Sequence, residues 1–221
     1  MKKYDLHIHS HYSTCSSNSP ETILKVAKKR GLDGIAVTDH NTIKGALFVK
    51  KLNKDRDFEV IVGEEIKTPV CEILAYHVNE EIKPGPLGEV LDKLHDQGCI
   101  TSIAHPFTLG VIRRSVPIDL RKLIGKVDAI ETFNGRMFTM LSNMKARTFA
   151  LENGFAQTGG SDAHFAWEIG RGWTVIEDSL ERDISARNTL TGGKFPLGII
   201  SRQLSLPVML SNELLASRSQ H

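Results

Sequence analysis

The chain has 221 residues and a nearly balanced charge, with 28 Lys and Arg against 26 Asp and Glu and a formal net charge of +2. This balance excludes a strongly basic nucleic-acid coat protein and an acidic disordered chain. Hydrophobic residues make up 40% and charged residues 24%, as in an ordinary globular protein. We expect a single domain over residues 1–221, in which residues 195–221 form a C-terminal extension or a closing helix.

The sequence also suggests a compartment. No apolar run approaches the roughly 18 to 20 residues that span a bilayer, and the N-terminus lacks the apolar stretch of a signal peptide. The three cysteines are too few, and odd in number, for a disulfide framework. These features predict a cytoplasmic protein that does not associate with membranes.

Short apolar segments alternate with amphipathic ones along the chain. Strands are predicted at 4–9, 34–39, 59–63, 72–78, 99–105, 129–133, 156–159 and 172–176. Ser19 and Pro20 mark the start of a helix that ends near Gly31, and further helices are predicted at 87–97, 138–153 and 181–191. This alternation favours a parallel α/β sheet closed, or nearly closed, into a barrel. Residues 204–215 are either a closing helix or an oligomer contact.

Histidines and carboxylates gather at the ends of the predicted strands. In a parallel barrel these ends share one face, where active sites assemble from successive loops. A His-x-His pair on a strand directs both imidazoles to the same side, and adjacent imidazoles with carboxylates bind divalent cations. A single histidine of this kind is more often structural, but the whole set predicts a metal site. Its members are His7, His9, Asp39, His40, Glu64, Glu65, Glu72, His105, Asp162 and His164.

Five motifs, in this order, resemble those of the polymerase and histidinol phosphatase (PHP) superfamily. They are DLHIHS at 5–10, GIAVTDHN at 34–41, GEEI at 63–66, AHP at 104–106 and GSDAH at 160–164. The resemblance covers residues 4 to about 176 and points to the stand-alone phosphoesterases of the superfamily. It implies a distorted (β/α)7 TIM-like barrel with two or three divalent ions, drawn from manganese, zinc, iron and magnesium, at the C-terminal ends of the strands.

The resemblance also implies a set of metal ligands. The first metal would be held by the His7 and His9 pair with two carboxylates, and Glu65 would bridge it to a second metal. Glu72 stands where many members carry a histidine, and a carboxylate there favours manganese or magnesium over zinc. A third metal would use His40 and His164. The implied ligands are His7, His9, His40, Glu65, Glu72, His105, Asp162 and His164.

The first loop departs from the family pattern. The superfamily usually has an aspartate there for the third metal, whereas this chain has Thr14 and Cys15. Cys15 is either a small buried residue or a thiolate ligand for zinc or iron. His11 is a second candidate replacement. The number of ions, two or three, therefore stays open at this point.

Other polar residues are candidates for catalysis or substrate binding. Asp39 either orients a ligand imidazole or caps the following helix. Asn134 ends the sixth predicted strand, where it would face substrate. Phosphate recognition favours the fork-shaped donors of arginine, so Arg171 and Arg113 are candidate substrate contacts. The candidate catalytic residues are Asp39, His40, His164 and Arg171.

Together these features predict a metal-dependent phosphoric ester hydrolase, a phosphatase or phosphodiesterase that uses a metal-activated hydroxide. The expected substrates are small phosphomonoesters, nucleotides or short oligonucleotides. The near-neutral charge disfavours stable binding of duplex nucleic acid, and a homodimer is the default expectation for a soluble enzyme. Two alternatives stay open, a metal-dependent C–N hydrolase of the amidohydrolase type and a metal-binding module without catalysis.

Overall fold

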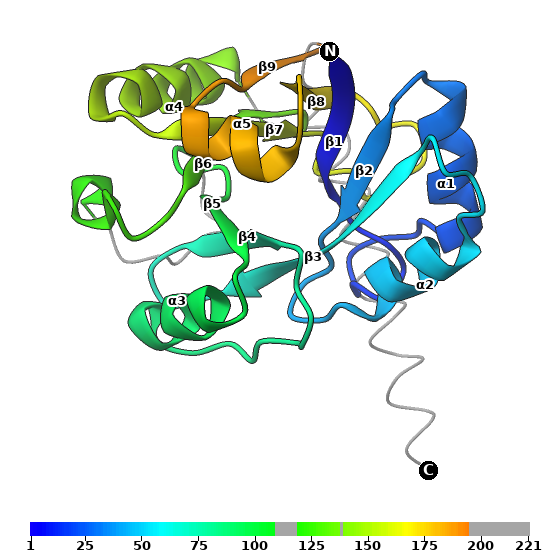
Figure 1. Cartoon of the computed structure of the whole chain (residues 1–221), viewed down its shortest axis with the longest axis horizontal. Helices are drawn as coiled ribbons and strands as arrows, with labels where there is room; N and C mark the ends of the chain where they lie inside the picture. The colour runs from blue at the N-terminus through cyan, green and yellow to red at the C-terminus, as the bar shows by residue number, and fades with distance from the viewer. Residues whose placement is uncertain (109–118, 138, 195–221) are drawn as a thin grey trace.

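The computed structural model describes residues 1–108, 119–137 and 139–194. Figure 1 shows its elements in chain order. The strands are β1 (Lys2–Ile8), β2 (Gly34–Val37), β3 (Glu59–Lys67), β4 (Glu72–Tyr76), β5 (Ile100–Ile103), β6 (Ala129–Asn134), β7 (Ala156–Gly160), β8 (Gly172–Ile176) and β9 (Leu190–Gly193). The helices are α1 (Pro20–Lys29), α2 (Lys44–Leu52), α3 (Leu87–Asp96), α4 (Met140–Asn153), α5 (Leu180–Ala186) and the 3-10 helix η1 (Leu120–Leu123).

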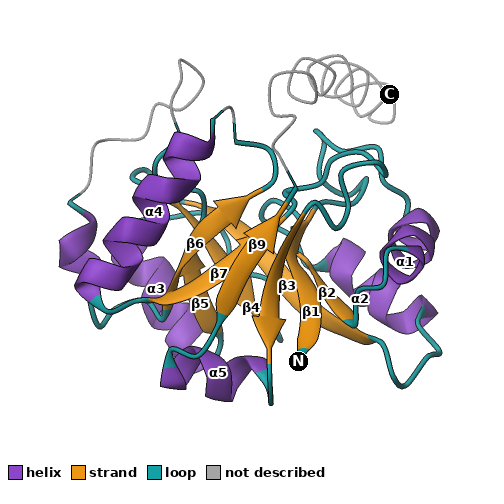
Figure 2. Cartoon of the chain, turned by 90° about the horizontal axis from the view of Figure 1, so that it is seen from above, coloured by secondary structure: helices purple, strands orange, loops and turns teal. Residues whose placement is uncertain are grey.

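The strands form one curled sheet with the helices around its outside (Figure 2). Their order is β7-β6-β5-β4-β3-β2-β1-β8-β9. The sheet nearly closes where the segment after β7 returns to the end of β1. There the Asp162 N–H donates to the His7 carbonyl at 2.7 Å, and the His9 N–H donates to the Ala163 carbonyl at 3.0 Å. The predicted α/β fold, a distorted TIM-like barrel, is confirmed.

The prediction of an entirely parallel sheet is wrong for part of the barrel. β1, β2 and β3 are parallel, as are β5, β6 and β7, but β4 runs antiparallel to both of its neighbours and β8 runs antiparallel to β1. The cause at β4 is a tight turn in which the Thr68 N–H donates to the Cys71 carbonyl at 3.0 Å. So short a link joins only antiparallel strands. As a result Glu72, the first residue of β4, lies at the same edge as the C-terminal ends of the parallel strands.

Two other elements differ from the sequence prediction. The sequence analysis sets no bounds for α2, because its N-cap residue Ile43 supplies no capping side chain and few of its residues are buried. The helix predicted over 181–191 ends early, because Arg187 adopts a left-handed φ of 56° and the chain then forms β9. The predicted element at 204–215 and the extension at 195–221 lie outside the described residues.

The apolar core joins the helices to the sheet. In α1 the Ser19 hydroxyl accepts a hydrogen bond from the Thr22 N–H at 3.2 Å and caps the helix start. The same helix buries Ile23 and Ala27 against strand residues such as Ile35. Full burial of a side chain like that of Ile23 contributes roughly 1.5–3 kcal/mol. This packing fixes the strand ends, which carry the polar residues described below.

Among the described residues, no helix combines the length and the apolar character needed to traverse a lipid bilayer.

Candidate metal centre

The eight predicted metal ligands come together at one edge of the barrel. Their ligand atoms form four overlapping groups, and within each group the atoms lie no more than 4.8 Å from one another. The first group contains three histidines, and the others combine histidines with carboxylates. The groups are His9, His40 and His164; His7, His105 and Asp162; His7, His9 and Glu65; and His40, Glu65 and Glu72.

Glu65 is the central carboxylate of this cluster. Its Oε2 atom lies 3.4 Å from His7 Nε2, 3.3 Å from His9 Nε2 and 3.0 Å from His40 Nδ1. Its Oε1 atom lies 3.1 Å from His105 Nε2. One buried carboxylate therefore meets imidazoles from the ends of β1, β2 and β5. A carboxylate in this position is able to bridge two cations.

The neighbouring Glu64 points elsewhere. Its carboxylate accepts a hydrogen bond from the Ile82 N–H at 3.0 Å, and burial raises its pKa to about 7. This difference follows from the alternation of side chains along β3.

Two imidazoles of the cluster are oriented by hydrogen bonds at Nδ1. His7 Nδ1 donates to Glu131 Oε1 at 2.8 Å, and His164 Nδ1 donates to the carbonyl oxygen of Asp162 at 2.8 Å. Both acceptors are oxygens that only accept hydrogen bonds, so each ring carries a proton on Nδ1, which leaves Nε2 as the atom for a metal. Metal-binding histidines commonly have this arrangement.

Ligand atoms of the cluster face one another closely, and two of them do not satisfy their hydrogen-bonding capacity. His7 Nε2 and His9 Nε2 are 3.1 Å apart. Glu65 Oε2 and His40 Nδ1 are buried and make no hydrogen bond to the described residues. Buried polar atoms are rarely left in this state, because their desolvation is costly. Divalent cations would satisfy these atoms, and a donor set of imidazole nitrogens and carboxylate oxygens suits zinc, iron or manganese. The residues therefore fit a multi-metal site.

The charges in the cluster stabilise one another. Burial opposes ionisation of Asp162, but the His7 and His9 imidazoles outweigh it and hold the pKa of this carboxyl well below its usual range. Burial likewise disfavours a charged His9, but Asp162 and Glu65 raise its pKa to about 9. In the absence of metal, protons occupy positions that a cation would otherwise take.

Backbone geometry at the site is unusual. Asp162 has a φ of 55° and His105 a φ of 28°, both in the left-handed region that is rare for residues other than glycine. At Gly160, just before the Asp162 turn, an added Cβ would lie 2.5 Å from His7 Cβ. Glycine therefore permits the close approach of β7 to β1 that brings Asp162 to the histidine pair.

Glu131 is a site residue that the sequence analysis missed. Besides holding His7, its Oε2 atom accepts hydrogen bonds from the His105 N–H at 2.7 Å and from Asn134 Nδ2 at 3.1 Å. It thus connects ligands from β1 and β5. The indication in the sequence is an acidic residue in the middle of the predicted strand at 129–133.

Asn134 was predicted to face substrate, and in the structure its side-chain contacts are with other residues of the site. The side chain is fully buried. Its Nδ2 atom donates to Glu131 and, at 3.3 Å, to Asp162 Oδ2, while its Oδ1 atom accepts from the Arg136 N–H. Because all of these contacts are internal, Asn134 holds Asp162 in place.

Asp39 was predicted to be catalytic, but its carboxylate does not reach the cluster. Oδ1 accepts from the Ser10 N–H at 2.7 Å and from the Ser13 hydroxyl at 2.8 Å, and Oδ2 accepts from the Ser10 hydroxyl at 2.6 Å. It does not cap α2 either, since that helix has no side-chain cap. Of the two roles considered for Asp39, orientation is the one its contacts support, because Ser13 in turn contacts His9.

The predicted role of Arg171 is not supported by its contacts. Its Nε atom donates to the Trp167 carbonyl at 3.2 Å, and its guanidinium lies 5.8 Å from the Trp167 ring centre. The arginine beside the cluster is instead Arg136, whose charge lowers the pKa of both Asp162 and His164. Arg136 follows no ligand motif, so its sequence context does not indicate this role. Arg113 lies outside the described residues.

Arg136 forms a buried ion pair behind His164. Its Nε atom lies 3.2 Å from Glu168 Oε1, and both side chains are almost fully buried. Glu168 Oε2 also accepts the backbone N–H groups of His164, at 2.7 Å, and Phe165, at 3.0 Å. The pair therefore supports the loop that carries His164.

Cys15 is buried, and its thiol is not part of any of the four ligand groups. Burial, with the charges of Asp162 and Glu65, raises its pKa to about 12, which favours the protonated thiol. Of the two roles considered for Cys15, these observations support the structural one. His9, His40 and His164 still converge without an acid from the first loop.

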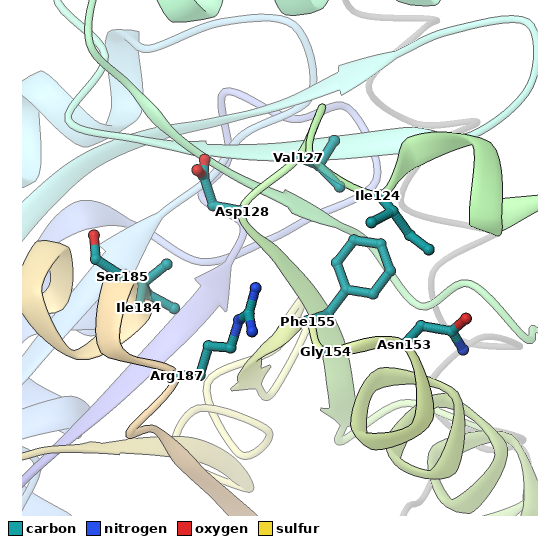
Figure 3. Close-up of a pocket in the computed structure, with 10 residues that line it drawn as sticks. Ile124, Val127, Asp128, Asn153, Gly154, Phe155, Ile184, Ser185 and Arg187 are labelled. Carbon is teal, nitrogen blue, oxygen red and sulfur yellow. The ribbon is translucent and has the colours of Figure 1, made fainter.

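A separate pocket lies at the other end of the barrel, before β6 and β7 (Figure 3). It has a volume of about 220 Å³ and is lined by residues that include Asp128, Phe155 and Arg187. None of its lining residues is a candidate metal ligand. The metal centre and this pocket are therefore distinct features.

The fold and the cluster define a PHP-type barrel with a candidate multi-metal site, and comparisons with known proteins agree. The PHP domain model matches residues 5–130, and the PHP-associated model matches residues 141–187. The chain is 34% identical over 196 residues to the uncharacterized protein MJ0417 of Methanocaldococcus jannaschii, covering 85% of this chain and 77% of that protein. The chain belongs to the PHP domain family.

Solved structures share the fold at low sequence identity. One is a two-domain protein from Bacteroides vulgatus that contains a predicted PHP-like metal-dependent phosphoesterase, with a TM-score of 0.71 and 20% identity. The match covers 87% of this chain but only 65% of that protein. Another is PsfC from Pseudomonas syringae, with a TM-score of 0.66 and 19% identity over 97% of this chain and 98% of that one. At these identities the likeness concerns the fold alone.

Proposed function

We propose that this protein is a divalent-metal-dependent phosphoesterase. The observation that carries the proposal is the environment of Glu65 Oε2, a buried oxygen without a hydrogen bond, within 3.4 Å of the ring nitrogens of His7, His9 and His40. Such a set of atoms suits two or three cations better than it suits a network of protons. Membership of the PHP domain family adds support, since the resemblance implies hydrolysis of phosphate esters.

The residues at the metal centre have different roles in the proposed reaction. Bound divalent cations would activate water and offset the negative charge of the phosphoryl group. Glu131 and the Asp162 carbonyl keep the protons of His7 and His164 on Nδ1, away from the cluster. Arg136, paired with Glu168, would hold the loop that carries His164, and its charge helps to keep Asp162 ionised as a ligand.

Substrate would enter beside His40 and Glu72. Their side chains are 20% and 14% exposed, whereas those of His7, His9 and His105 are almost completely buried. His40 is therefore the imidazole best placed to meet the leaving oxygen as a general acid. The proposed substrates are small phosphomonoesters, nucleotides or short oligonucleotides.

The test combines metal content with turnover. Elemental analysis of the purified protein, loaded in turn with manganese and zinc, is paired with hydrolysis of an aryl phosphate and a panel of nucleotides. We expect two or three ions per chain and turnover that depends on them. His9→Ala and Asp162→Ala should abolish turnover while the fold persists, and His95→Ala, which alters an exposed histidine of α3, should leave it unchanged.

The other outcomes separate the alternatives. Full activity in both His9→Ala and Asp162→Ala would contradict the proposed mechanism. Bound ions without phosphate release would favour a non-catalytic metal-binding module. Release of amine from amide substrates by the same metal-loaded protein would favour a C–N hydrolase instead.

A further inference from the structure

Ser13, in the loop after β1, joins three parts of the candidate metal centre. The residue is 1% exposed. Its hydroxyl oxygen lies 2.8 Å from Asp39 Oδ1, 2.9 Å from the backbone nitrogen of His40 and 3.2 Å from His9 Nδ1. It occupies the loop in which the expected metal-binding aspartate is missing, and it stands between Asp39 and the His9 ring.

The hydrogen-bonding capacity of a hydroxyl determines the direction of each contact. A serine hydroxyl has one hydrogen to donate and two lone pairs with which to accept. The Asp39 carboxylate is an acceptor, so it receives the hydrogen. The His40 backbone N–H is a donor, so it uses one lone pair. One lone pair remains for His9, and His9 therefore donates its Nδ1 hydrogen to Ser13.

We propose that Ser13 is a positioning residue that holds His9 with its proton on Nδ1 and its Nε2 atom directed at the metals. This completes a set in which His7, His9 and His164 each have a separate acceptor for Nδ1–H, namely Glu131, Ser13 and the Asp162 carbonyl. The same hydroxyl fixes the backbone of His40, a second candidate ligand from another strand. The part of this proposal that concerns metal binding rests on the proposed function. The hydrogen bond between His9 and Ser13 does not depend on it.

Nitrogen-15 NMR of the histidine rings, recorded on metal-free protein, tests the hydrogen bond directly. His9 should show a one-bond hydrogen–nitrogen correlation at Nδ1 that exchanges slowly with water, whether or not Nε2 is also protonated. Ser13→Ala should abolish this slow exchange, because the acceptor is lost. Ser13→Thr keeps a hydroxyl at this position and should retain the slow exchange of the His9 Nδ1 hydrogen.

Ser16→Ala is the matched control. Ser16 lies in the same loop and is equally buried, but its hydroxyl bonds to the carbonyl oxygens of His9 and His164 and not to a ring. This variant should keep the His9 Nδ1 signal. A structural disturbance of the loop alone would affect Ser13→Ala and Ser16→Ala alike.

Zinc affinity, measured by competition with a chelator, supplies the second readout. Loss of a partner that orients a ligand typically lowers metal affinity 10–100-fold, and we expect Ser13→Ala to fall in this range. A wild-type His9 with its neutral proton on Nε2, or an Nδ1 signal unchanged in Ser13→Ala, would overturn the proposal. The wild-type spectrum alone shows whether His9 carries its proton on Nδ1, so the proposal stays testable even if the alanine variant does not fold. Absence of zinc binding despite the expected Nδ1 signal would overturn the proposed function instead.

Discussion

Glu131 links His7 and His105, two candidate ligands that are 98 positions apart along the chain. One carboxylate oxygen accepts the Nδ1 hydrogen of His7 at 2.8 Å, and the other accepts the backbone N–H of His105 at 2.7 Å. The carboxylate therefore sets both the ring orientation of one ligand and the backbone position of another. No motif of the sequence includes this residue.

Replacing Glu131 with glutamine should weaken metal binding about 10–100-fold, because the amide is a poorer acceptor for the His7 ring hydrogen. Chelator competition with zinc measures the change. Glu152→Gln, on the exposed face of α4, is the control and should bind zinc as the wild type does. Equal affinities in the two variants would show that the His7 orientation does not depend on Glu131.

Gly45 of α2 should tolerate no side chain. A Cβ at this position would lie 2.0 Å from Asp39 Oδ2 and 2.2 Å from the Ser10 hydroxyl oxygen. We expect Gly45→Ala to lower the free energy of unfolding by about 1–3 kcal/mol, through overpacking, and to reduce metal content by displacing Asp39. Urea unfolding and elemental analysis measure the two effects.

The matched control is Gly88→Ala in α3, where an added Cβ meets no atom within 4 Å. There alanine should stabilise the helix by up to about 1 kcal/mol, since it restricts the unfolded chain. If Gly45→Ala and Gly88→Ala shift the unfolding midpoint in the same direction, a steric clash at Gly45 does not explain the effect.

The buried pair of Arg136 and Glu168 should be costly to break. Removing one partner leaves an uncompensated buried charge, and Arg136→Met should therefore destabilise the fold by about 3–5 kcal/mol. Arg182→Met breaks an exposed pair with Asp178 and should change the stability far less, because solvent screens that pair. Chemical denaturation of Arg136→Met, of Glu168→Gln and of the variant that combines them measures the coupling. Strict additivity in the double variant would contradict a direct interaction.

The stability of the metal-free protein should fall as the pH rises toward about 9. The folded-state pKa of His9, about 9, lies above the ordinary value of 6.5. This histidine therefore contributes its full stabilisation below about pH 6.5 and loses it as the pH rises to about 9. A shift of this size corresponds to on the order of 3 kcal/mol.

Zinc should have the opposite pH dependence, because protons cease to compete for the imidazole as the pH rises. The increase in Tm on adding zinc should thus grow across the same pH interval. Thermal unfolding with zinc and with a chelator, compared at several pH values, checks both trends. A zinc effect that does not vary with pH would rule out competition between zinc and protons at the histidines.

Local patterns in the sequence determined much of the site. His7 and His9 lie on one side of β1 because side chains alternate with a period of two, and the same alternation separates Glu65 from Glu64. The motifs that carry the other ligands stand at strand ends, and parallel strands bring those ends to one edge of a barrel. These patterns predicted the barrel and a metal site at its edge, and the resemblance to the PHP superfamily narrowed the polar residues there to the eight implied ligands.

Tertiary structure alone decided which polar residues support these ligands. Glu131 and Asn134 lie within or at the end of a buried strand, where only the neighbouring strands reveal what their side chains contact. The charge of Arg136 acts on Asp162, whereas Arg171 contacts Trp167, and nothing in the local sequence distinguishes the two arginines in this way. The reversal of β4, which places Glu72 in the cluster, depends on one tight turn. Spacing along a chain fixes the face on which a side chain lies, whereas its partners depend on contacts between distant segments.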